Sequence, residues 1–261
     1  MRRFPTLVLW LGLALAGILI FHHPRAVTNN EVYDGFEGST LSDVWSMDRF
    51  EPGAVEFQSA IVRTGKGAAK ITVHQGDKYE GTDPLQSKPT ERAELQERKD
   101  FVAREGDGLA YSFSIYIPKD FPVVPTRLVL AQWKQYDQTH HVLVDSPLVA
   151  LRYVQGELYV SLQTGREQQA MYRATDDVRG RWLDFVFHLK FTHAPDGLLR
   201  VWLNGKQLCD YHGITAYTEE YGYVKDGHYY FKMGLYRDRM AEPMTAYFDE
   251  YRKRPLTADE L

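Results

Sequence analysis

The segment Tyr111-Ser112-Phe113-Ser114-Ile115-Tyr116-Ile117 alternates between two sets of side chains with a period of two residues. Successive side chains of a β-strand point to opposite faces of its sheet, so Tyr111, Phe113 and the two isoleucines would share one apolar face. Pro118 then ends the strand, and further prolines mark an irregular loop. The segment therefore predicts a β-strand with one buried face.

Strand-like segments recur along the chain after residue 30, separated by turn signals. They cover residues 127–133, 147–154, 158–163, 182–191, 199–203, 207–210, 229–236 and 245–252. Asn204-Gly205 is the strongest hairpin signal in the chain, and Gln155-Gly156-Glu157 predicts a second hairpin. Long helical patterns are absent beyond residue 26. We therefore predict an all-β protein with a single β-sandwich or jelly-roll domain over residues 31–254, followed by a short C-terminal tail over residues 255–261.

The composition is that of a globular protein, with 261 residues of which 44% are hydrophobic and 13% aromatic. Cys209 is the single cysteine, so no intrachain disulfide can form. The net charge is −4, and it becomes −7 (28 basic and 35 acidic residues) without residues 1–26. We therefore expect no nucleic-acid partner. A local basic cleft remains compatible with this balance, because salt screens each charge within about 10 Å.

Arg2 and Arg3 precede an apolar run over residues 7–21. A basic start followed by about fifteen apolar residues is typical of a signal peptide, and it is short for a membrane span, which needs about 20 residues. No A-x-A pattern precedes Ala26, so an uncleaved signal anchor is the alternative. Residues 1–26 therefore predict a periplasmic or secreted protein whose membrane attachment, if it has one, is through this segment alone.

The segment Tyr229-Tyr230-Phe231-Lys232-Met233-Gly234-Leu235-Tyr236-Arg237 has two different faces if it forms a strand. Phe231, Met233 and Leu235 share an apolar face. The other face carries Tyr230, Lys232, Gly234 and Tyr236. Lys232 and Arg237 are cations that would favour the phenolate form of a neighbouring tyrosine, and Gly234 would let a ligand approach the backbone. The alternative is an ordinary strand with a solvated polar face.

Two further segments could supply groups that bind a carboxylate. In residues 91–97, read as a strand, Arg92 and Glu94 share a face, so that Glu94 could hold the Arg92 guanidinium in place for a bidentate contact. A surface charge ladder or a short helix are the alternatives for this segment. In residues 130–135, Gln132 and Lys134 share a face, and Trp133 points to the opposite side, toward the core.

These segments together resemble a known family. The order Arg-x-Glu-Leu at 92–95, Gln-Trp-x at 132–134 and Tyr-Phe-Lys-x-Gly-x-Tyr at 230–236 is similar to that of the polysaccharide lyases related to glucuronan lyase and heparin lyase I. Alginate lyases of similar jelly-roll fold carry a related triplet. The resemblance extends over about residues 32–254 through segments 182–186, 201–206 and 247–251. It implies a concanavalin-like jelly roll and a lyase that acts on an acidic polysaccharide, glucuronan-like as the first choice.

The resemblance also implies roles for individual residues. Such lyases cleave a 4-linked uronate by β-elimination, which requires a neutralised carboxylate, a base for the C5 proton and an acid for the leaving oxygen. Arg92 and Gln132 would bind the carboxylate, and Tyr236 matches the catalytic tyrosine. Lys232 matches a substrate-binding lysine. The remaining substrate-binding candidates are Glu94, Tyr230, Lys134, Arg237 and His141.

The sequence departs from the pattern at Lys134, because the alginate lyases have histidine two residues after the glutamine. A lysine serves as a base only when burial or other cations lower its pKa. His140 and His141 follow nearby and could supply the imidazole, with His140 as the catalytic candidate; two solvent-exposed loop histidines are the alternative. His74 and His228 are weaker candidates. The identity of the base therefore stays open.

We expect no cofactor for the chemistry, whereas a structural Ca²⁺ is a further expectation. Asp34 and Glu37 begin the domain and Asp249 lies near its end. Jelly-roll relatives often hold Ca²⁺ where the terminal strands meet, and carboxylates are its preferred ligands. A solvated acidic edge is the alternative reading of these residues.

Three functions remain at this point: a lyase acting as a monomer on a uronate polymer, a non-catalytic carbohydrate-binding sandwich, and a glycoside hydrolase of similar fold. The set Arg92, Gln132, Lys232 and Tyr236 favours the lyase. A hydrolase needs two carboxylates roughly 5–9 Å apart, and a Glu-x-Asp-x-x-Glu strand that would provide them is absent from the sequence. The sequence does not name the polymer, nor does it distinguish endo from exo action.

Overall fold

The computed structural model describes residues 31–46, 50–78, 89–136, 146–174, 176–221 and 227–261. These residues form fifteen β-strands and three short 3₁₀ helices, η1 (Lys99–Phe101), η2 (Glu219–Tyr221) and η3 (Ala258–Glu260). Among them, no helix has the length and apolar character that crossing a membrane requires. The signal or anchor segment 1–26 lies outside the described residues, so export stays a prediction.

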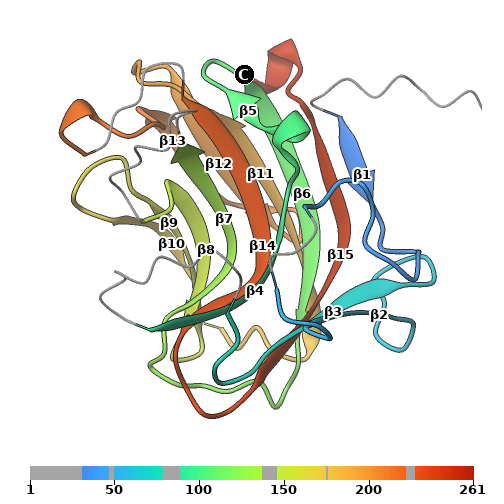
Figure 1. Cartoon of the computed structure of the whole chain (residues 1–261). Helices are drawn as coiled ribbons and strands as arrows, with labels where there is room; N and C mark the ends of the chain where they lie inside the picture. Colours follow the sequence, from blue (N-terminus) through green and yellow to red (C-terminus); the bar gives the residue numbers. More distant parts are fainter. Residues whose placement is uncertain (1–30, 47–49, 79–88, 137–145, 175, 222–226) are drawn as a thin grey trace, which may run out of the picture.

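The strands form two antiparallel sheets, which lie face to face in Figure 1. The eight-stranded sheet has the order β13-β12-β11-β6-β15-β3-β2, and β1 pairs with β15. Its strands are β1 (Val32–Asp34), β2 (Val55–Gln58), β3 (Ala68–Val73), β6 (Gly108–Ile117), β11 (Arg181–Lys190), β12 (Gly197–Leu203), β13 (Lys206–Gly213) and β15 (Met244–Pro255).

The seven-stranded sheet has the order β10-β9-β8-β7-β14-β4, and β5 pairs with β14. Its strands are β4 (Thr90–Gln96), β5 (Ala103–Arg104), β7 (Leu128–Tyr136), β8 (Val149–Val154), β9 (Glu157–Leu162), β10 (Gln169–Arg173) and β14 (His228–Asp238). The predicted all-β sandwich is therefore confirmed, and residues 91–96 are strand rather than helix.

Both predicted hairpins are present. Asn204 and Gly205 have φ angles of 49° and 78° and connect β12 to β13. Gln155 and Gly156 have φ angles of 53° and 85° and connect β8 to β9. Two successive positive φ values are the geometry of a type I′ turn, whose twist matches that of the paired strands. The turn residues therefore set the register of both hairpins.

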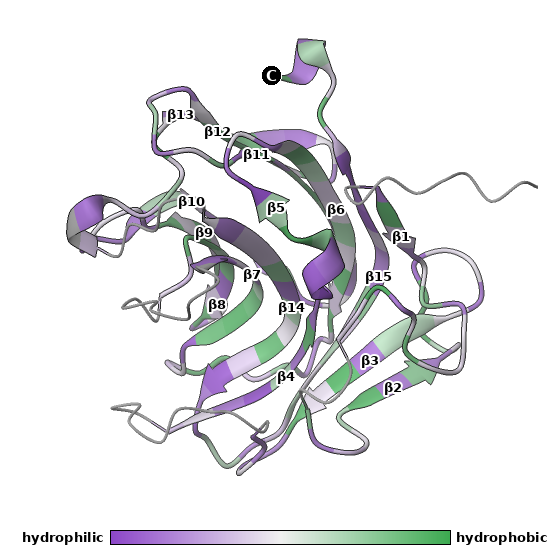
Figure 2. Ribbon diagram, turned by 45° about the horizontal axis from the view of Figure 1, so that its top comes forward, coloured by the Kyte–Doolittle hydropathy of each residue, from purple (hydrophilic) through white to green (hydrophobic). Residues whose placement is uncertain are grey.

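The core between the sheets is built on aromatic rings from both of them. The Trp133 ring (β7) lies 4.9 Å from that of Phe231 (β14), 4.6 Å from that of Phe187 (β11) and 5.4 Å from that of Tyr111 (β6), between ring centroids. All four side chains are fully buried, as predicted for Trp133 and Phe231. Figure 2 shows hydrophobic and hydrophilic residues along the strands of both sheets.

A buried ion pair also joins the two sheets. The Lys253 ammonium (β15) lies 2.8 Å from the Glu97 carboxylate, which follows β4, and neither side chain is exposed. The Tyr251 hydroxyl donates a hydrogen bond to the same carboxylate. Burial raises the pKa of Glu97, and the Lys253 ammonium opposes that shift. Each charge is therefore tolerated in the core because the other is present.

The three carboxylates expected to hold Ca²⁺ all accept hydrogen bonds from other groups of the protein. Asp34 accepts hydrogen bonds from the Phe36 amide and the Trp45 indole, at 2.8 and 2.7 Å. Glu37 accepts one from the Lys66 amide. Asp249 accepts hydrogen bonds from the backbone amides of Arg63 and Glu250, both at 2.8 Å. Among the residues that the structure describes, no three acidic, histidine or cysteine side chains gather where they could hold an ion. These oxygens hold turns, and the calcium site stays a prediction.

Gly234 has a backbone role in the sheet, and the approach of a ligand at this position stays a prediction. It has a φ angle of 140°, and a Cβ added there would lie 2.3 Å from the carbonyl oxygen of Ala93 in β4. The register between β14 and β7 shifts between Met233 and Tyr236, so Gly234 lies in an irregular part of the strand. Glycine is needed here because β4 and β14 approach each other too closely for a side chain.

We expect Gly234→Ala to lower the free energy of unfolding by more than Gly53→Ala does. Gly53 is a matched control, with a φ angle of 82° and no atom within 4 Å of an added Cβ. The control should lose about 1 kcal/mol, the cost of a left-handed backbone for alanine. Urea denaturation of both variants measures the difference. Equal losses would show that contact with β4 is not what requires glycine at position 234.

Burial of Asp249 predicts a pH-dependent stability. Burial raises the pKa of its carboxyl from 3.8 to about 6. The folded state therefore binds this proton more tightly than the unfolded chain does, and the stabilisation is full below pH 3.8 and lost as the pH rises through about 6. Relative to the wild type, Asp249→Asn should thus become more stable as the pH rises from about 4 to about 7. Urea denaturation across this range measures the difference.

Asp196→Asn is the control for this pH series. The Lys190 ammonium donates a hydrogen bond to Asp196 and lowers the pKa of its carboxyl, which is the opposite direction. This variant should show no relative gain between about pH 5 and pH 7. A gain as large as that of Asp249→Asn would contradict the assignment to Asp249.

Candidate active site

The candidate residues lie on three adjacent strands, with β14 between β4 and β7. Lys232 of β14 pairs with Gln132 of β7, and Tyr236 of β14 pairs with Arg92 of β4. These side chains share one face of the seven-stranded sheet, because the odd-numbered residues of β14 from Phe231 to Leu235 fill the core on the other face. The structure thus brings together the four residues on which the sequence argument rests most.

Glu94 lies at the centre of this group. Its Oε1 accepts a hydrogen bond from the Gln132 amide nitrogen at 2.5 Å. Its Oε2 lies 4.0 Å from the Arg92 guanidinium and 3.9 Å from the Lys232 ammonium. All four side chains are buried. A buried carboxylate shared among these donors holds them in fixed positions and offsets part of their positive charge.

Two guanidinium groups lie over the ring of Tyr236. The Arg92 Cζ atom is 4.2 Å and the Arg127 Cζ atom is 4.7 Å from the ring centroid. Arg127 also pairs with Asp238 at 2.7 Å. Burial tends to lower the pKa of Arg127, but the hydrogen bond to Asp238 and the nearby Tyr236 oxygen outweigh it and raise that pKa. Arg127 therefore stays charged beside the phenol.

Sequence reasoning missed Arg127. It directly precedes β7 and belongs to none of the motifs. Its place beside Tyr236 follows from the pairing of Leu128 with Arg237 and of Val129 with Tyr236 across the strands. The sequence shows a cation at the start of the strand that contains Gln132. This position points to Tyr236 only when the register between β7 and β14 is known.

Tyr230 and Lys134 lie on the same face of the sheet, further along β14 and β7. They are direct cross-strand partners. The Lys232 ammonium is 5.6 Å from the centroid of the Tyr230 ring. Both residues are thus in position to extend a substrate-binding surface away from Tyr236, and their substrate-binding roles stay predictions.

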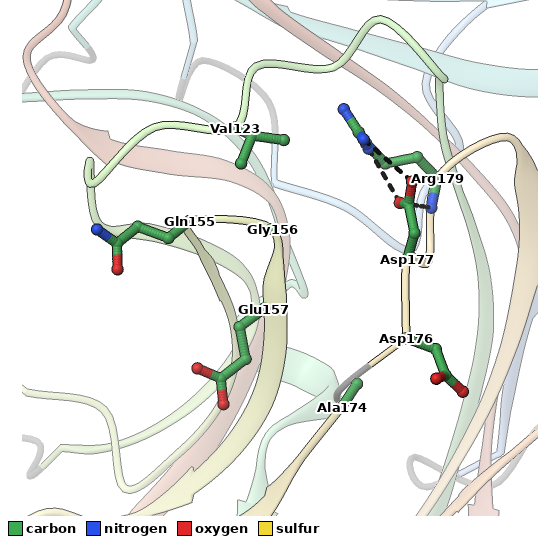
Figure 3. Close-up of a pocket in the computed structure, with 8 residues that line it drawn as sticks. All are labelled: Val123, Gln155, Gly156, Glu157, Ala174, Asp176, Asp177 and Arg179. Atoms are coloured by element: carbon green, nitrogen blue, oxygen red, sulfur yellow. Dashed lines mark hydrogen bonds and ion pairs between the residues drawn. The ribbon is translucent and has the colours of Figure 1, made fainter.

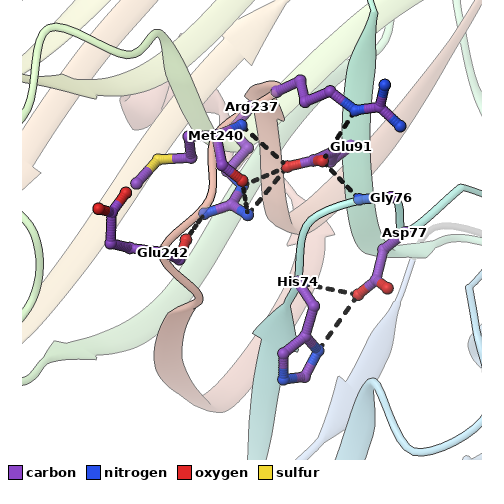
Figure 4. Close-up of polar contacts among 8 residues, drawn as sticks. His74, Gly76, Asp77, Glu91, Arg237, Met240 and Glu242 are labelled. Carbon is purple, nitrogen blue, oxygen red and sulfur yellow. Dashed lines mark hydrogen bonds and ion pairs between the residues drawn. The ribbon is translucent and has the colours of Figure 1, made fainter.

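Arg237 is not on this face, and its substrate-binding assignment is corrected. The side chain is fully buried and pairs with Glu91, with the guanidinium Nη2 2.9 Å from a carboxylate oxygen. It also donates a hydrogen bond to the carbonyl of Glu242 at 2.5 Å. Figure 4 shows the guanidinium between Glu91 and the turn that contains Met240 and Glu242. Arg237 has the parity of Leu235, so the strand directs it away from Tyr236.

The structure describes two of the four histidine candidates, His74 and His228. His140 and His141 lie outside the described residues. His74 is exposed and lies 3.5 Å from the Asp77 carboxylate, as Figure 4 shows. His228 has the parity of Lys232 and begins β14 on the same face of the sheet. The second proton-transfer group therefore stays a prediction.

A pocket of about 530 Å³ lies at the turns that surround the β8–β9 hairpin, and Figure 3 shows it. Glu157, Asp176 and Asp177 line it, and its one arginine, Arg179, pairs with Asp177 at 3.0 Å. Its excess of negative charge disfavours an anionic ligand. None of the candidate catalytic residues that the structure describes lines this pocket, so we do not assign the substrate to it.

A sequence model of the family described as polysaccharide lyase matches residues 28–252. No curated protein sequence matches the chain significantly. Solved structures share its fold at low identity. The endo-β-1,4-glucuronan lyase of the fungus Trichoderma reesei has 17% identity and a TM-score of 0.65, over 88% of this chain and 98% of that one. A family 7 alginate lyase, AlgAT5, has 15% identity and a TM-score of 0.53, over 79% and 84%.

The alginate lyase Aly36B shares the fold with still lower identity, 8%, at a TM-score of 0.58 over 87% of this chain and 97% of that one. Of the three functions expected from the sequence, the family match supports the lyase, because the matching family is one of polysaccharide lyases. With residues 28–252 inside one family, and with the residues of its motifs gathered on one sheet, this chain belongs to the polysaccharide lyase family and is a lyase.

Proposed function

We propose that this lyase cleaves a 4-linked uronate polymer by β-elimination, with glucuronan as the first choice and Tyr236 as the catalytic residue. The observation that supports it most is the phenol ring of Tyr236 under two guanidinium groups, 4.2 and 4.7 Å from its centroid. In the proposed reaction Tyr236 acts as a phenolate, which can accept a proton from carbon, beside the positive charges of Arg92 and Arg127.

Arg92 and Gln132 would bind the carboxylate of the uronate that loses its C5 proton. One N–H of the Gln132 amide donates a hydrogen bond to Glu94, and the second N–H would donate one to a substrate oxygen. Lys232, held by Glu94 at 3.9 Å, adds a third donor to the same group. These donors would stabilise the negative charge that spreads from C5 into the carboxylate in the transition state.

The proton transfers can be written with Tyr236 alone. The phenolate oxygen takes the C5 proton, and the electron pair of that C–H bond forms the C4–C5 double bond. The C4–O4 bond breaks as the double bond forms. The phenol then gives its proton to the leaving O4, which restores the phenolate and leaves an unsaturated uronate at the new non-reducing end.

The choice of a D-glucuronate unit over an L-uronate rests on stereochemistry. In D-glucuronate the C5 proton and the C4 oxygen lie on the same side of the ring, so one tyrosine can serve as base and then as acid. In L-guluronate or L-iduronate they lie on opposite sides, and a second group is required. Lys134, where the alginate lyases have histidine, is a poor candidate for that second group unless its pKa is lowered. The T. reesei protein that shares the fold is described as a glucuronan lyase, which agrees with this choice.

Export is part of the proposal. A basic start followed by an apolar run in residues 1–26 would direct the domain out of the cytoplasm. A polysaccharide of this kind would be met in the periplasm or outside the cell. Whether the segment is cleaved or retained as an anchor would decide between a freely diffusing enzyme and one held at the membrane.

The wild-type protein should produce ultraviolet absorbance from an unsaturated uronate when incubated with glucuronan, and less or none with alginate, hyaluronan or heparin. Tyr236→Phe should lower this rate at least about 10³-fold, because it removes both proton transfers. Tyr33→Phe is the control, since Tyr33 is an exposed tyrosine on β1 of the other sheet. Reducing ends formed without absorbance, or an active Tyr236→Phe variant, would contradict the mechanism.

Removal of the Arg127 guanidinium should slow the reaction, because its positive charge lies beside the group that takes the proton. Arg127→Gln should therefore lower kcat/KM. Arg127→Lys should lower it less, because it keeps the charge without the planar group. The rate of unsaturated-product formation measures the loss. Arg181→Gln, at an exposed position on the other sheet, is the control. Equal kcat/KM values for Arg127→Gln and wild type would contradict the role of Arg127.

A further inference from the structure

Arg152 extends the candidate site onto β8. The sheet register places Ala150 opposite Gln132 and Arg152 opposite Val129, which itself pairs with Tyr236. Arg152 has the parity of Ala150, so its side chain lies on the same face as Gln132 and Tyr236. The guanidinium of Arg127 lowers the pKa of Arg152, and the phenol of Tyr236 raises it.

Arg152 is the exception among the buried cations of the described residues. Four of these cations have a carboxylate within 4.0 Å: Arg92 and Lys232 with Glu94, Arg237 with Glu91, and Lys253 with Glu97. Arg152 is only 4% exposed, and in the part of the chain that the structure describes it forms no ion pair. Its Nε donates a hydrogen bond to the Ser161 hydroxyl at 3.0 Å.

A buried guanidinium without a counter-ion is costly, because burial disfavours a charge that nothing neutralises. Burial accordingly lowers the pKa of Arg152, and Arg127 acts in the same direction. Ser161 engages only the Nε atom. The two terminal nitrogens are the pair that binds a carboxylate side by side. An anionic ligand on this face would therefore supply the counter-ion that the described residues do not.

Tyr159 and Arg173 continue the same row across the sheet, since Tyr159 pairs with both Arg152 and Arg173. The Arg173 guanidinium is already engaged, because it lies 4.6 Å from the Tyr159 ring centroid and pairs with Glu157 at 3.1 Å. The unneutralised charge in this row is thus at Arg152, between the catalytic group and an aromatic ring. This arrangement suits a neighbouring sugar unit that has its own carboxylate.

We propose that Arg152 binds the carboxylate of a second uronate unit of the same chain, beside the unit that Tyr236 deprotonates. The inference rests on the proposed function, because it requires a polymer with a carboxylate on successive units. It makes Arg152 a residue that selects polyuronates over neutral polymers and over single uronates. Ser161 is then a positioning residue that fixes the guanidinium through Nε.

The test is made in the full chain, with Arg152→Met. Binding of a glucuronan tetrasaccharide is measured by calorimetry in the Tyr236→Phe background, which prevents turnover. A 4-linked glucose tetrasaccharide, which has the same backbone without carboxylates, is the matched ligand. Arg181→Met, the same change at an exposed arginine of the other sheet, is the matched protein control. Thermal unfolding is followed for every variant.

Arg152→Met should bind the glucuronan tetrasaccharide about tenfold to a hundredfold more weakly, as expected for a lost hydrogen-bonded charge, and should bind the neutral tetrasaccharide as before. Its Tm should be unchanged or higher, because an unpaired buried charge has been removed. With Tyr236 present, KM for glucuronan should rise while kcat changes little. Arg152→Lys should restore part of the affinity.

Equal affinity of Arg152→Met and the parent for the acidic ligand would overturn the inference. A lowered Tm, a failure to fold, or an equal loss of both ligands would also overturn it, since each would mean that Arg152 supports the fold. The proposed function is judged separately, by whether the wild type releases unsaturated product from glucuronan. If the wild type cleaves glucuronan but Arg152→Met binds the acidic tetrasaccharide as tightly as the parent does, this inference is rejected and the proposed function stands.

Discussion

The packing of Trp133 against Phe231 is the contact on which the site depends. Their ring centroids are 4.9 Å apart, and both rings are buried against the second sheet. Because side chains alternate along a strand, burying these two rings turns Gln132 and Lys232 to the opposite face, on neighbouring strands. A shift of one residue in either strand would bury the polar groups and expose the rings, so the hydrophobic core fixes the orientation of the candidate catalytic groups.

The electrostatics of the site differ from those of the chain as a whole. The chain has a net charge of −4, yet the face that contains Tyr236 has Arg92, Arg127, Arg152 and Lys232 against Glu94 and Asp238. This local excess of positive charge is held together by Glu94, because a shared carboxylate reduces the repulsion between the donors around it. Under the proposed function, this excess would attract an acidic polymer to this face of the protein.

Much of the site was predictable because it depends on alternation within short segments. Period two placed Lys232 and Tyr236 on one face and Phe231 on the other, and the structure agrees. The same rule, applied one residue further, places Arg237 on the core face, so its assignment to the substrate was an avoidable error. Arg127 and Arg152 were missed for a different reason. Their relation to Tyr236 runs through hydrogen-bonded partners on other strands.

By itself, the sequence determined the fold class, the two hairpins and the two faces of each strand, since these follow from residues that are adjacent or nearly so. The tertiary structure decided which strands are neighbours, and with them the pairing of Tyr236 with Arg92 and the close approach of β4 to Gly234. These features depend on registers and bulges between segments that are far apart in the chain. No local pattern contains them, because they arise only when distant strands pair and bury a common core.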